Sequence, residues 1–243
     1  METTVGKPEK SVHHMLLDEM RSGIYRNADM LPPENILAER LSISRTQLRD
    51  SLAQLEREGF ITRRHGIGTI INRHVLSVKV RADMEVEFCD MIEKSGYGAK
   101  VKAVRAERVP ADSVTADRLN IRPGDPVFMV TRTVLAGGKP TIYCEDYFPV
   151  SLVTDNSYSR SELNQPIFTF LKKHCGLEPY MDLTDIHPVL ADRKLSGLLD
   201  VPKGTPLLFM DERDFDKDGV TILYSRQYYI DGIITHTLLR RKF

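Results

Sequence analysis

The 243-residue sequence has few cysteines, no tryptophan and no long apolar run. Its three cysteines, Cys89, Cys144 and Cys175, are odd in number and far apart, which argues against a disulfide framework and suits a reducing cytoplasm. No CxxC pair or close Cys/His cluster predicts a metal site, and we expect no cofactor. No segment approaches the ~18 apolar residues of a membrane span, and the N-terminus lacks a signal-peptide core. We therefore expect a cytoplasmic protein without a membrane partner.

The sequence also has no net charge, because 34 Lys and Arg balance 34 Asp and Glu. The global basic excess of many nucleic-acid binders is missing. The charge is nevertheless unevenly distributed. Between residues 40 and 73, seven arginines stand against three acidic residues. Such a stretch alone is typical of a solvated helix surface, so its interpretation depends on the pattern within it.

The first third of the chain predicts a winged helix-turn-helix domain, residues 1–73. Helices are expected over 8–25 and 34–41, with a third that opens at Ser44 and ends near Gly59. Ser44 and Gln47 form a capping-box pattern, and the third helix buries Leu48, Leu52 and Leu55. Residues 60–63 and 69–72 predict two short strands joined by a glycine-containing loop.

This arrangement suits DNA binding. In a helix-turn-helix the last helix enters the major groove, with its N-terminal residues at the base edges. Arg45 and Arg49 are four residues apart and share a helical face, and arginine forks fit guanine. A wing with two glycines can bring its backbone close to DNA.

Residues 10–72 resemble the DNA-binding domain of the GntR family of bacterial transcriptional regulators. The matching motifs are Leu31-Pro32-Pro33-Glu34, Ser44 to Leu52, Leu55 to Ile61 and Gly66-Ile67-Gly68-Thr69. The resemblance implies that Arg45, Thr46, Gln47 and Arg49 meet the major groove and that His65 and Gly66 meet the minor groove. Asn35 stands where the family commonly has an arginine, which affects the expected operator sequence but not the docking mode. The candidate DNA-contacting residues are Asn35, Ser44, Arg45, Thr46, Gln47, Arg49, Arg64, His65, Gly66 and Gly68.

Beyond a linker at 74–79, residues 80–243 predict an α+β domain with a mainly antiparallel sheet. Strands are expected over 101–109, 127–135, 141–148, 207–215 and 220–229, and helices over 84–94, 111–119, 167–175 and 191–199. Asp231-Gly232 predicts a type I′ hairpin that returns 233–240 against the preceding strand. We see no internal repeat. Asp182, Asp185 and His187 do not share one face of a strand, so a metal or acid/base site there is not favoured.

Residues 80–240 resemble the UTRA effector domain of the HutC-type subfamily of GntR regulators, which is similar in fold to chorismate lyase. The resemblance rests on Leu119 with Gly124-x-Pro126-Val127, Gly138-Lys139-Pro140, Tyr147-Phe148-Pro149, Leu198 to Pro206 and the terminal Ser225-x-x-Tyr228. It implies a homodimer that binds a palindromic double-stranded DNA operator and a small-molecule effector.

A hairpin that turns at residues 136–139 would place Arg132 opposite Tyr143 and on one face with Glu145 and Tyr147. An arginine, a carboxylate and tyrosines can bind a small polar molecule, although a solvated cross-strand salt bridge explains the same pattern. The subfamily also lines its effector cleft with the last two strands. The candidate effector-binding residues are Arg132, Tyr143, Glu145, Arg213, Ser225 and Tyr228.

Only one arginine stands where relatives that respond to sugar phosphates carry Arg-x-Arg, since Val134 replaces the second. We therefore expect a polar or singly anionic effector. The leading hypothesis is a ligand-responsive transcriptional regulator, a repressor. The alternatives are an enzyme of chorismate-lyase-like fold and a regulator whose second domain only dimerises. The sequence has no nucleophile–base motif or phosphate loop, which disfavours an enzyme.

Overall fold

The computed structural model describes residues 11–84, 86–155, 157–159, 162 and 166–241, with the backbone alone for Ala103. The start of the predicted helix 8–25 thus lies outside the described residues. The chain divides into two compact units, one up to Asp83 together with the segment from Thr237, and one from Met84 to His236. This division differs from the predicted boundaries, because 80–83 and the C-terminal segment belong to the first unit. The predicted linker 74–79 also contains part of a helix, α4 (Arg73–Leu76).

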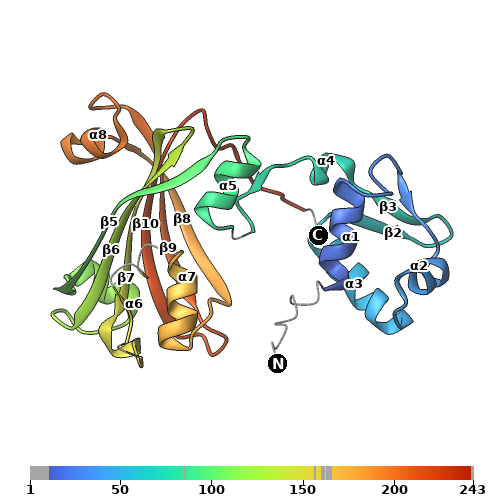
Figure 1. The fold of residues 1–243 in the computed structure, drawn as a ribbon, viewed down its shortest axis with the longest axis horizontal. Helices are drawn as coiled ribbons and strands as arrows, with labels where there is room; N and C mark the ends of the chain where they lie inside the picture. The colour runs from blue at the N-terminus through green and yellow to red at the C-terminus, as the bar shows by residue number, and fades with distance from the viewer. Residues whose placement is uncertain (1–10, 85, 156, 160–161, 163–165, 242–243) are drawn as a thin grey trace, which may run out of the picture. The chain divides into compact units, whose positions relative to one another are not determined.

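The first unit is a three-helix winged domain (Figure 1). Its helices are α1 (Val12–Arg21), α2 (Glu34–Leu41) and α3 (Arg45–Arg57). Its sheet has the order β1-β3-β2, from β1 (Met30–Leu31), β2 (Ile61–Arg64) and β3 (Gly68–Ile71). Leu48, Leu52 and Leu55 are buried, as predicted, so they fix which face of α3 remains outside. The two-residue strand β1 was not predicted.

The C-terminal segment does not form the predicted hairpin with the preceding strand. The turn at Asp231-Gly232 leads instead to β11 (His236–Thr237), which pairs with β4 (Val80–Arg81). The physical reason is that β10 (Thr221–Ile230) is hydrogen-bonded on both sides, to β7 and β9, and has no free edge. A turn motif reverses the chain but does not supply a vacant partner strand.

The second unit is built on a six-stranded antiparallel sheet of order β5-β6-β7-β10-β9-β8. Its other strands are β5 (Ala99–Pro110), β6 (Pro126–Ala136), β7 (Lys139–Pro149), β8 (Met181–Leu190) and β9 (Pro206–Phe215). Its helices are α5 (Phe88–Lys94), α6 (Ser113–Leu119), α7 (Ile167–Phe170) and α8 (Arg193–Leu199). A 3₁₀ turn spans Val150–Leu152, and a π-helical turn, Leu171–Cys175, continues α7.

The sheet is symmetric: counted from either edge, its first three strands follow one another in chain order. The two halves form an internal repeat, which was not predicted from the sequence. Strand–helix–strand–strand units β5-α6-β6-β7 and β8-α8-β9-β10 are related by an offset of about 80 residues. Both helices begin at an aspartate, Asp112 or Asp192, whose side chain accepts from the backbone N–H three residues later. Both end at a left-handed residue, Asn120 or Asp200. Few identities survive between the repeats, because the fold requires only caps, turns and apolar positions to be retained.

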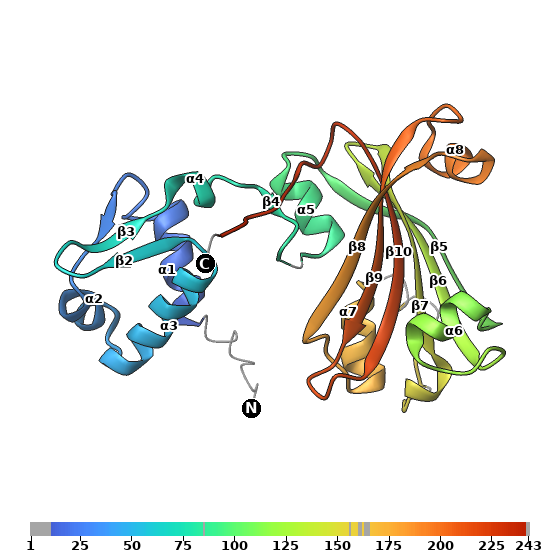
Figure 2. The same cartoon turned by 180° about the vertical axis from the view of Figure 1, so that it is seen from behind.

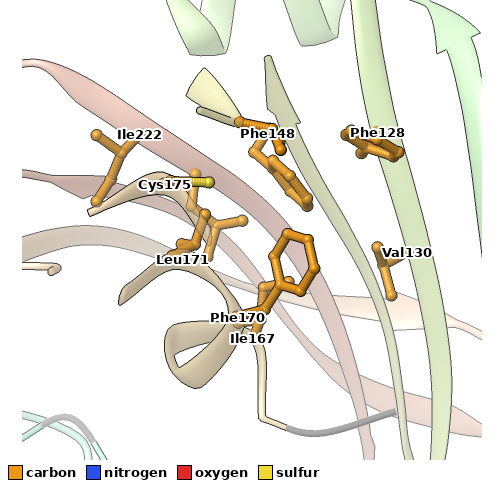
Figure 3. Close-up of a cluster of buried hydrophobic side chains, with 10 residues drawn as sticks. Phe128, Val130, Phe148, Ile167, Phe170, Leu171, Cys175 and Ile222 are labelled. Carbon is orange, nitrogen blue, oxygen red and sulfur yellow. The ribbon is translucent and has the colours of Figure 1, made fainter. Parts of the chain in front are cut away.

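The sheet has two distinct faces, because side chains alternate along each strand. α6 and α8 pack on one face, where Leu195 and Leu199 contact Tyr143 and Tyr228 (Figures 1 and 2). We call it the α6–α8 face. The opposite α5–α7 face carries an apolar cluster in which Phe148 of β7 and Phe170 of α7 point toward one another (Figure 3). Helices therefore cover part of both faces of the sheet.

Candidate DNA-binding and effector sites

The N-terminal end of α3 is fixed by its own sequence. The Ser44 side chain accepts from the Gln47 N–H at 3.2 Å, and the Gln47 side chain accepts from the Ser44 N–H at 3.2 Å. This confirmed capping box satisfies end groups that would otherwise lack partners. Arg45, Thr46 and Arg49 are exposed, and the two arginines lie beside the buried leucine face, each three residues before a buried leucine.

All ten predicted DNA-contacting residues are exposed: Asn35, Ser44, Arg45, Thr46, Gln47, Arg49, Arg64, His65, Gly66 and Gly68. They come from the start of α2, the start of α3 and the wing. Arg49 is not entirely free, since its Nε lies 2.8 Å from Glu34 Oε2. Among the described residues, no ion pair involves Arg45. Arg45 is thus the better-placed of the two arginines for a base edge.

The wing tip depends on its two glycines. Gly66 and Gly68 have φ of 75° and 123°, in the region that residues with a Cβ rarely adopt. A Cβ on Gly68 would lie 2.8 Å from the Met30 side chain, so this position also needs the absence of a side chain. Between the glycines Ile67 is 58% exposed. The tip therefore presents backbone, His65 and one apolar side chain.

Four of the seven arginines between residues 40 and 73 make contacts inside the unit. Arg40 pairs with Glu19 at 3.1 Å, and Arg63 pairs with Glu56 at 2.7 Å. Arg49 pairs with Glu34, and Arg73 donates to backbone carbonyls, including that of Met20 at 2.8 Å. These internal contacts therefore leave fewer arginines available at the surface than the sequence suggested. Three exposed arginines remain: Arg45, Arg57 and Arg64.

The segments that flank the second unit in sequence are anchored in the first. Arg81 donates to the Glu58 carbonyl, pairs with Asp83 and lies 5.3 Å from the Phe60 ring centroid. The Ala82 N–H donates to the Thr237 carbonyl at 2.9 Å, and Arg241 donates to the Glu56 carbonyl. Both chain connections therefore end on the DNA-binding unit, which no sequence motif indicated.

In the second unit Arg132 does not lie opposite Tyr143. Its cross-strand neighbour is Cys144, because β7 contains one extra residue near the turn, where the register shifts between Val134 and Leu135. A one-residue slip moves every side chain to the other face. The predicted grouping of Arg132 with Tyr143, Glu145 and Tyr147 is therefore wrong.

Arg132 is instead part of a buried polar network on the α5–α7 face. It pairs with Asp146, and the Ser225 hydroxyl donates to Asp146 at 2.9 Å. Arg132 and Asp146 are 3% and 1% exposed, and burial raises the pKa of Asp146 even though Arg132 and Ser225 oppose that shift. Of the predicted effector residues, Arg132 and Ser225 thus lie together.

The network continues across β10 and β9 with residues that sequence reasoning missed. The Gln227 amide donates to Glu212 at 2.9 Å, and Thr184 donates to Glu212 at 3.0 Å. Tyr229 donates to the Gln227 side-chain oxygen. In the internal repeat Glu212 corresponds to Arg132, so a cation and an anion occupy equivalent positions. From the sequence, only the offset of about 80 residues between the repeats could have shown that these two positions correspond.

Glu87, at the start of α5, adds a titratable group beside this network. Burial raises its pKa to about 7, the charge of Arg132 opposes the shift, and the charges of Asp146 and Asp90 add to it. A carboxyl with this pKa changes protonation near neutrality. Arg132, Glu87 and Asp146 therefore form one electrostatically coupled group.

The other predicted effector residues lie on the α6–α8 face: Tyr143, Glu145, Arg213 and Tyr228. Glu145 accepts from the hydroxyls of Tyr143 and Tyr147, at 3.0 and 3.3 Å, and pairs with Lys194 and Arg226. Burial alone would raise the pKa of Glu145, but the bonds from Lys194 and Tyr143 outweigh it and lower that pKa. Its two oxygens thus contact four side chains within the protein.

Within the described ranges, no group of three metal-ligating side chains is close enough to hold an ion, and no helix is long and apolar enough to cross a membrane. All three cysteines are free thiols.

Comparison with known proteins agrees with both units. Residues 8–71 match the family model "Bacterial regulatory proteins, gntR family", and residues 94–231 match the UTRA domain. The chain is 23% identical over 237 residues to the mannosyl-D-glycerate transport/metabolism system repressor MngR of Escherichia coli, covering 96% of this chain and 97% of that one. It is 25% identical over 230 residues to the probable fructoselysine utilization operon transcriptional repressor of the same species, covering 94% and 92%.

Among solved structures, YydK of Bacillus subtilis, a possible transcriptional regulator, superposes with a TM-score of 0.76 at 19% identity, covering 94% of this chain and 99% of that one. PhnF of Mycobacterium smegmatis superposes with a TM-score of 0.56 at 23% identity, covering 94% and 96%. The two family models and the relatives together define a DNA-binding transcriptional regulator that a ligand modulates. The chain belongs to the UTRA-domain branch of the GntR family, consistent with the HutC-type subfamily.

Proposed function

We propose that this protein is a cytoplasmic repressor that binds a palindromic operator as a homodimer. A small molecule bound on the α5–α7 face of the second unit changes that binding. The observation that carries the proposal is the exposed, capped start of α3 in the same chain as a buried polar network. Symmetric half-sites follow from dimer symmetry, because each recognition helix reads one of them.

In the DNA-binding unit, Arg45, Thr46, Gln47 and Arg49 would read the major groove, since the first residues of a recognition helix reach the base edges. Ser44 lies at the helix N-terminus, where free amides favour a phosphate. Arg64, His65, Gly66 and Gly68 would bring the wing to the minor groove or the backbone. Asn35, exposed at the start of α2, would contact the backbone beside it.

The effector site that we propose contains Arg132, Asp146, Ser225, Glu212 and Gln227. Asp146 already neutralises Arg132, so a strongly anionic effector would have to displace a carboxylate. Hydroxyl or ammonium groups would instead donate to Asp146, Glu212 and Glu87. The structure thus favours a polar, hydroxyl-rich effector over the anion that the sequence also allowed. The names of two relatives refer to mannosyl-D-glycerate and fructoselysine, which are both polyhydroxylated and each carry one carboxylate.

We further propose that the second unit binds its ligand without turnover. Its relatives are transcriptional regulators. A turnover assay with chorismate-like substrates, run beside a gel shift on DNA upstream of the gene, tests this point. Product formation at a catalytic rate would contradict the proposal.

The DNA part is tested by titrating operator and scrambled DNA at several salt concentrations. Each neutralised phosphate adds about −0.9 to the slope of log affinity against log salt. Arg45, Arg57 and Arg64, the exposed arginines of residues 40–73 outside the ion pairs described above, amount to six in a dimer and predict a slope of about −5. A flat line, or equal affinity for scrambled DNA, would overturn the assignment.

The effector part is tested with a thermal-shift screen of polar metabolites, followed by gel shifts with the compounds that bind. Two matched variants locate the site: Glu212→Gln on the α5–α7 face and Glu145→Gln on the α6–α8 face. We expect Glu212→Gln to weaken the response at least tenfold and Glu145→Gln to retain it. The reverse result would move the site to the α6–α8 face.

A further inference from the structure

The edge strand β8 carries large apolar side chains on its surface. Leu183, Ile186 and Leu190 are 55%, 49% and 67% exposed, and Met181 at the start of the strand is also exposed. Edge strands present unpaired backbone groups, and soluble proteins normally protect them with charges, bulges or prolines. β8 has two such features, the exposed Asp185 and Pro188, but its pairing with β9 is regular from end to end.

The equivalent edge in the other repeat, β5, is protected much more strongly. Five of its exposed side chains are charged, four of them basic: Lys100, Lys102, Arg105, Glu107 and Arg108. Its pairing with β6 is interrupted by a register shift between Lys102 and Arg105. Because the two strands occupy equivalent places in the sheet, the apolar character of β8 is not a general consequence of the fold.

The backbone of β8 leaves alternate residues available for pairing. The Ala191 N–H donates to the Thr205 carbonyl at 2.9 Å, in the register of the β8–β9 ladder. Alternation along an antiparallel strand therefore directs the odd-numbered residues toward β9 and the even-numbered ones away from it. Thr184 and Ile186 thus face outward with both backbone groups. Pro188 faces outward with a carbonyl only, which limits the ladder but leaves its centre intact.

We propose that β8 pairs antiparallel with β8 of a second copy of this chain and so joins the two sheets into one. The inference rests on the homodimer of the proposed function and adds its contact surface. A two-fold axis through Ile186 places the two Ile186 residues opposite each other. The same axis sets Leu183 against Val189 of the second copy.

Charge selects this register. Centred on Ile186, the pairing sets the exposed Asp185 opposite His187 of the second copy, twice by symmetry. Centred on Asp185, it would set two carboxylates opposite each other, which is destabilising. The centre at Ile186 thus avoids opposed carboxylates and removes apolar side chains from water.

The first experiment measures the dimer dissociation constant of the full chain by analytical ultracentrifugation. Ile186→Lys places two ammonium groups on the two-fold axis and is expected to raise the dissociation constant at least tenfold. The matched control, Glu107→Lys, puts the same residue at an exposed position of the other edge and is expected to leave it within twofold. Thermal unfolding of both variants checks that the fold is intact.

The second experiment remains informative if Ile186→Lys fails to fold. Opposed residues in a hydrogen-bonded antiparallel pair have Cα atoms about 5.5 Å apart, within the range of about 4.4–6.8 Å that a disulfide spans. In a Cys89→Ser background, Ile186→Cys is expected to form an intermolecular disulfide under mild oxidation, and Glu107→Cys is not.

The outcomes separate the two proposals. A parent chain that is monomeric at all concentrations, also when bound to operator, overturns the homodimer and this surface together. A parent dimer that Ile186→Lys leaves unchanged, without a disulfide in Ile186→Cys, overturns only the β8 surface. Equal cross-linking at Glu107→Cys also overturns it, because it indicates random collision.

Discussion

The two candidate sites hold their charged side chains in different ways. At the start of α3, Arg45 and its neighbours are exposed and placed by one helix and its cap. On the α5–α7 face, Arg132 and Asp146 are almost fully buried and are placed by the register of several strands. Charged side chains that bind a polyanion such as DNA can stay hydrated until the complex forms. Charges that select a small molecule must be oriented beforehand and therefore need partners within the protein.

This difference predicts unequal effects of mutation on stability. Asp146→Ala leaves the buried Arg132 without its partner and is expected to destabilise the second unit by about 3–5 kcal/mol. Replacing both, as Arg132→Met with Asp146→Leu, is expected to cost less than the single change. Chemical denaturation of the parent, single and double variants measures the three free energies of unfolding. A double variant that is less stable than Asp146→Ala would contradict the view that the pair is held by mutual compensation.

The exposed site is expected to show the opposite behaviour, with an effect on binding and little on stability. Arg45→Ala removes a side chain that can form a bidentate base contact, at about 1–3 kcal/mol of operator discrimination. Arg57→Ala, at the exposed end of the same helix, is the matched control and is expected to weaken specific and scrambled DNA alike. Titrations at fixed salt compare the preference for operator. An unchanged preference in Arg45→Ala would remove α3 from its assigned role.

The protonation of Glu87 makes the stability of the buried site depend on pH, which the exposed site is not expected to show. Its pKa is raised from about 4.5 in the unfolded chain to about 7 in the folded one, because burial disfavours the charged form. Its protonation thus favours the folded state fully below pH 4.5, and this contribution is lost as pH rises toward 7. Glu87→Gln cannot ionise, so its melting temperature relative to the parent is expected to rise between pH 4.5 and pH 8. A difference that stays constant over this range would contradict the assigned burial.

The smallest effect is expected at Arg49. Its Nε is paired with Glu34 on the surface, and such exposed pairs contribute at most about 1 kcal/mol. Arg49→Ala is therefore expected to weaken operator binding less than Arg45→Ala does, with stability unchanged within that margin. Parallel titrations of the two variants decide the order. A larger loss for Arg49→Ala would show that its pair with Glu34 opens on DNA.

The sequence by itself determined the DNA-binding unit, because its decisive features are local. The cap at Ser44, the buried leucines at helical spacing and the glycines of the wing each act over a few residues. The α+β character of the second unit also followed from local strand and helix patterns. Its internal repeat did not, because the two halves retain caps and turns but few identical residues.

Only the tertiary structure decided where the effector-domain side chains meet. One extra residue in β7 moved Arg132 to the face opposite Glu145 and brought Asp146 to it instead. The strand after Gly232 found no free edge on β10 and paired with β4. The contrast between β5 and β8 also needed the sheet order, which shows that both are edges. Register and edge availability depend on strands far apart in sequence, so no local pattern contains them.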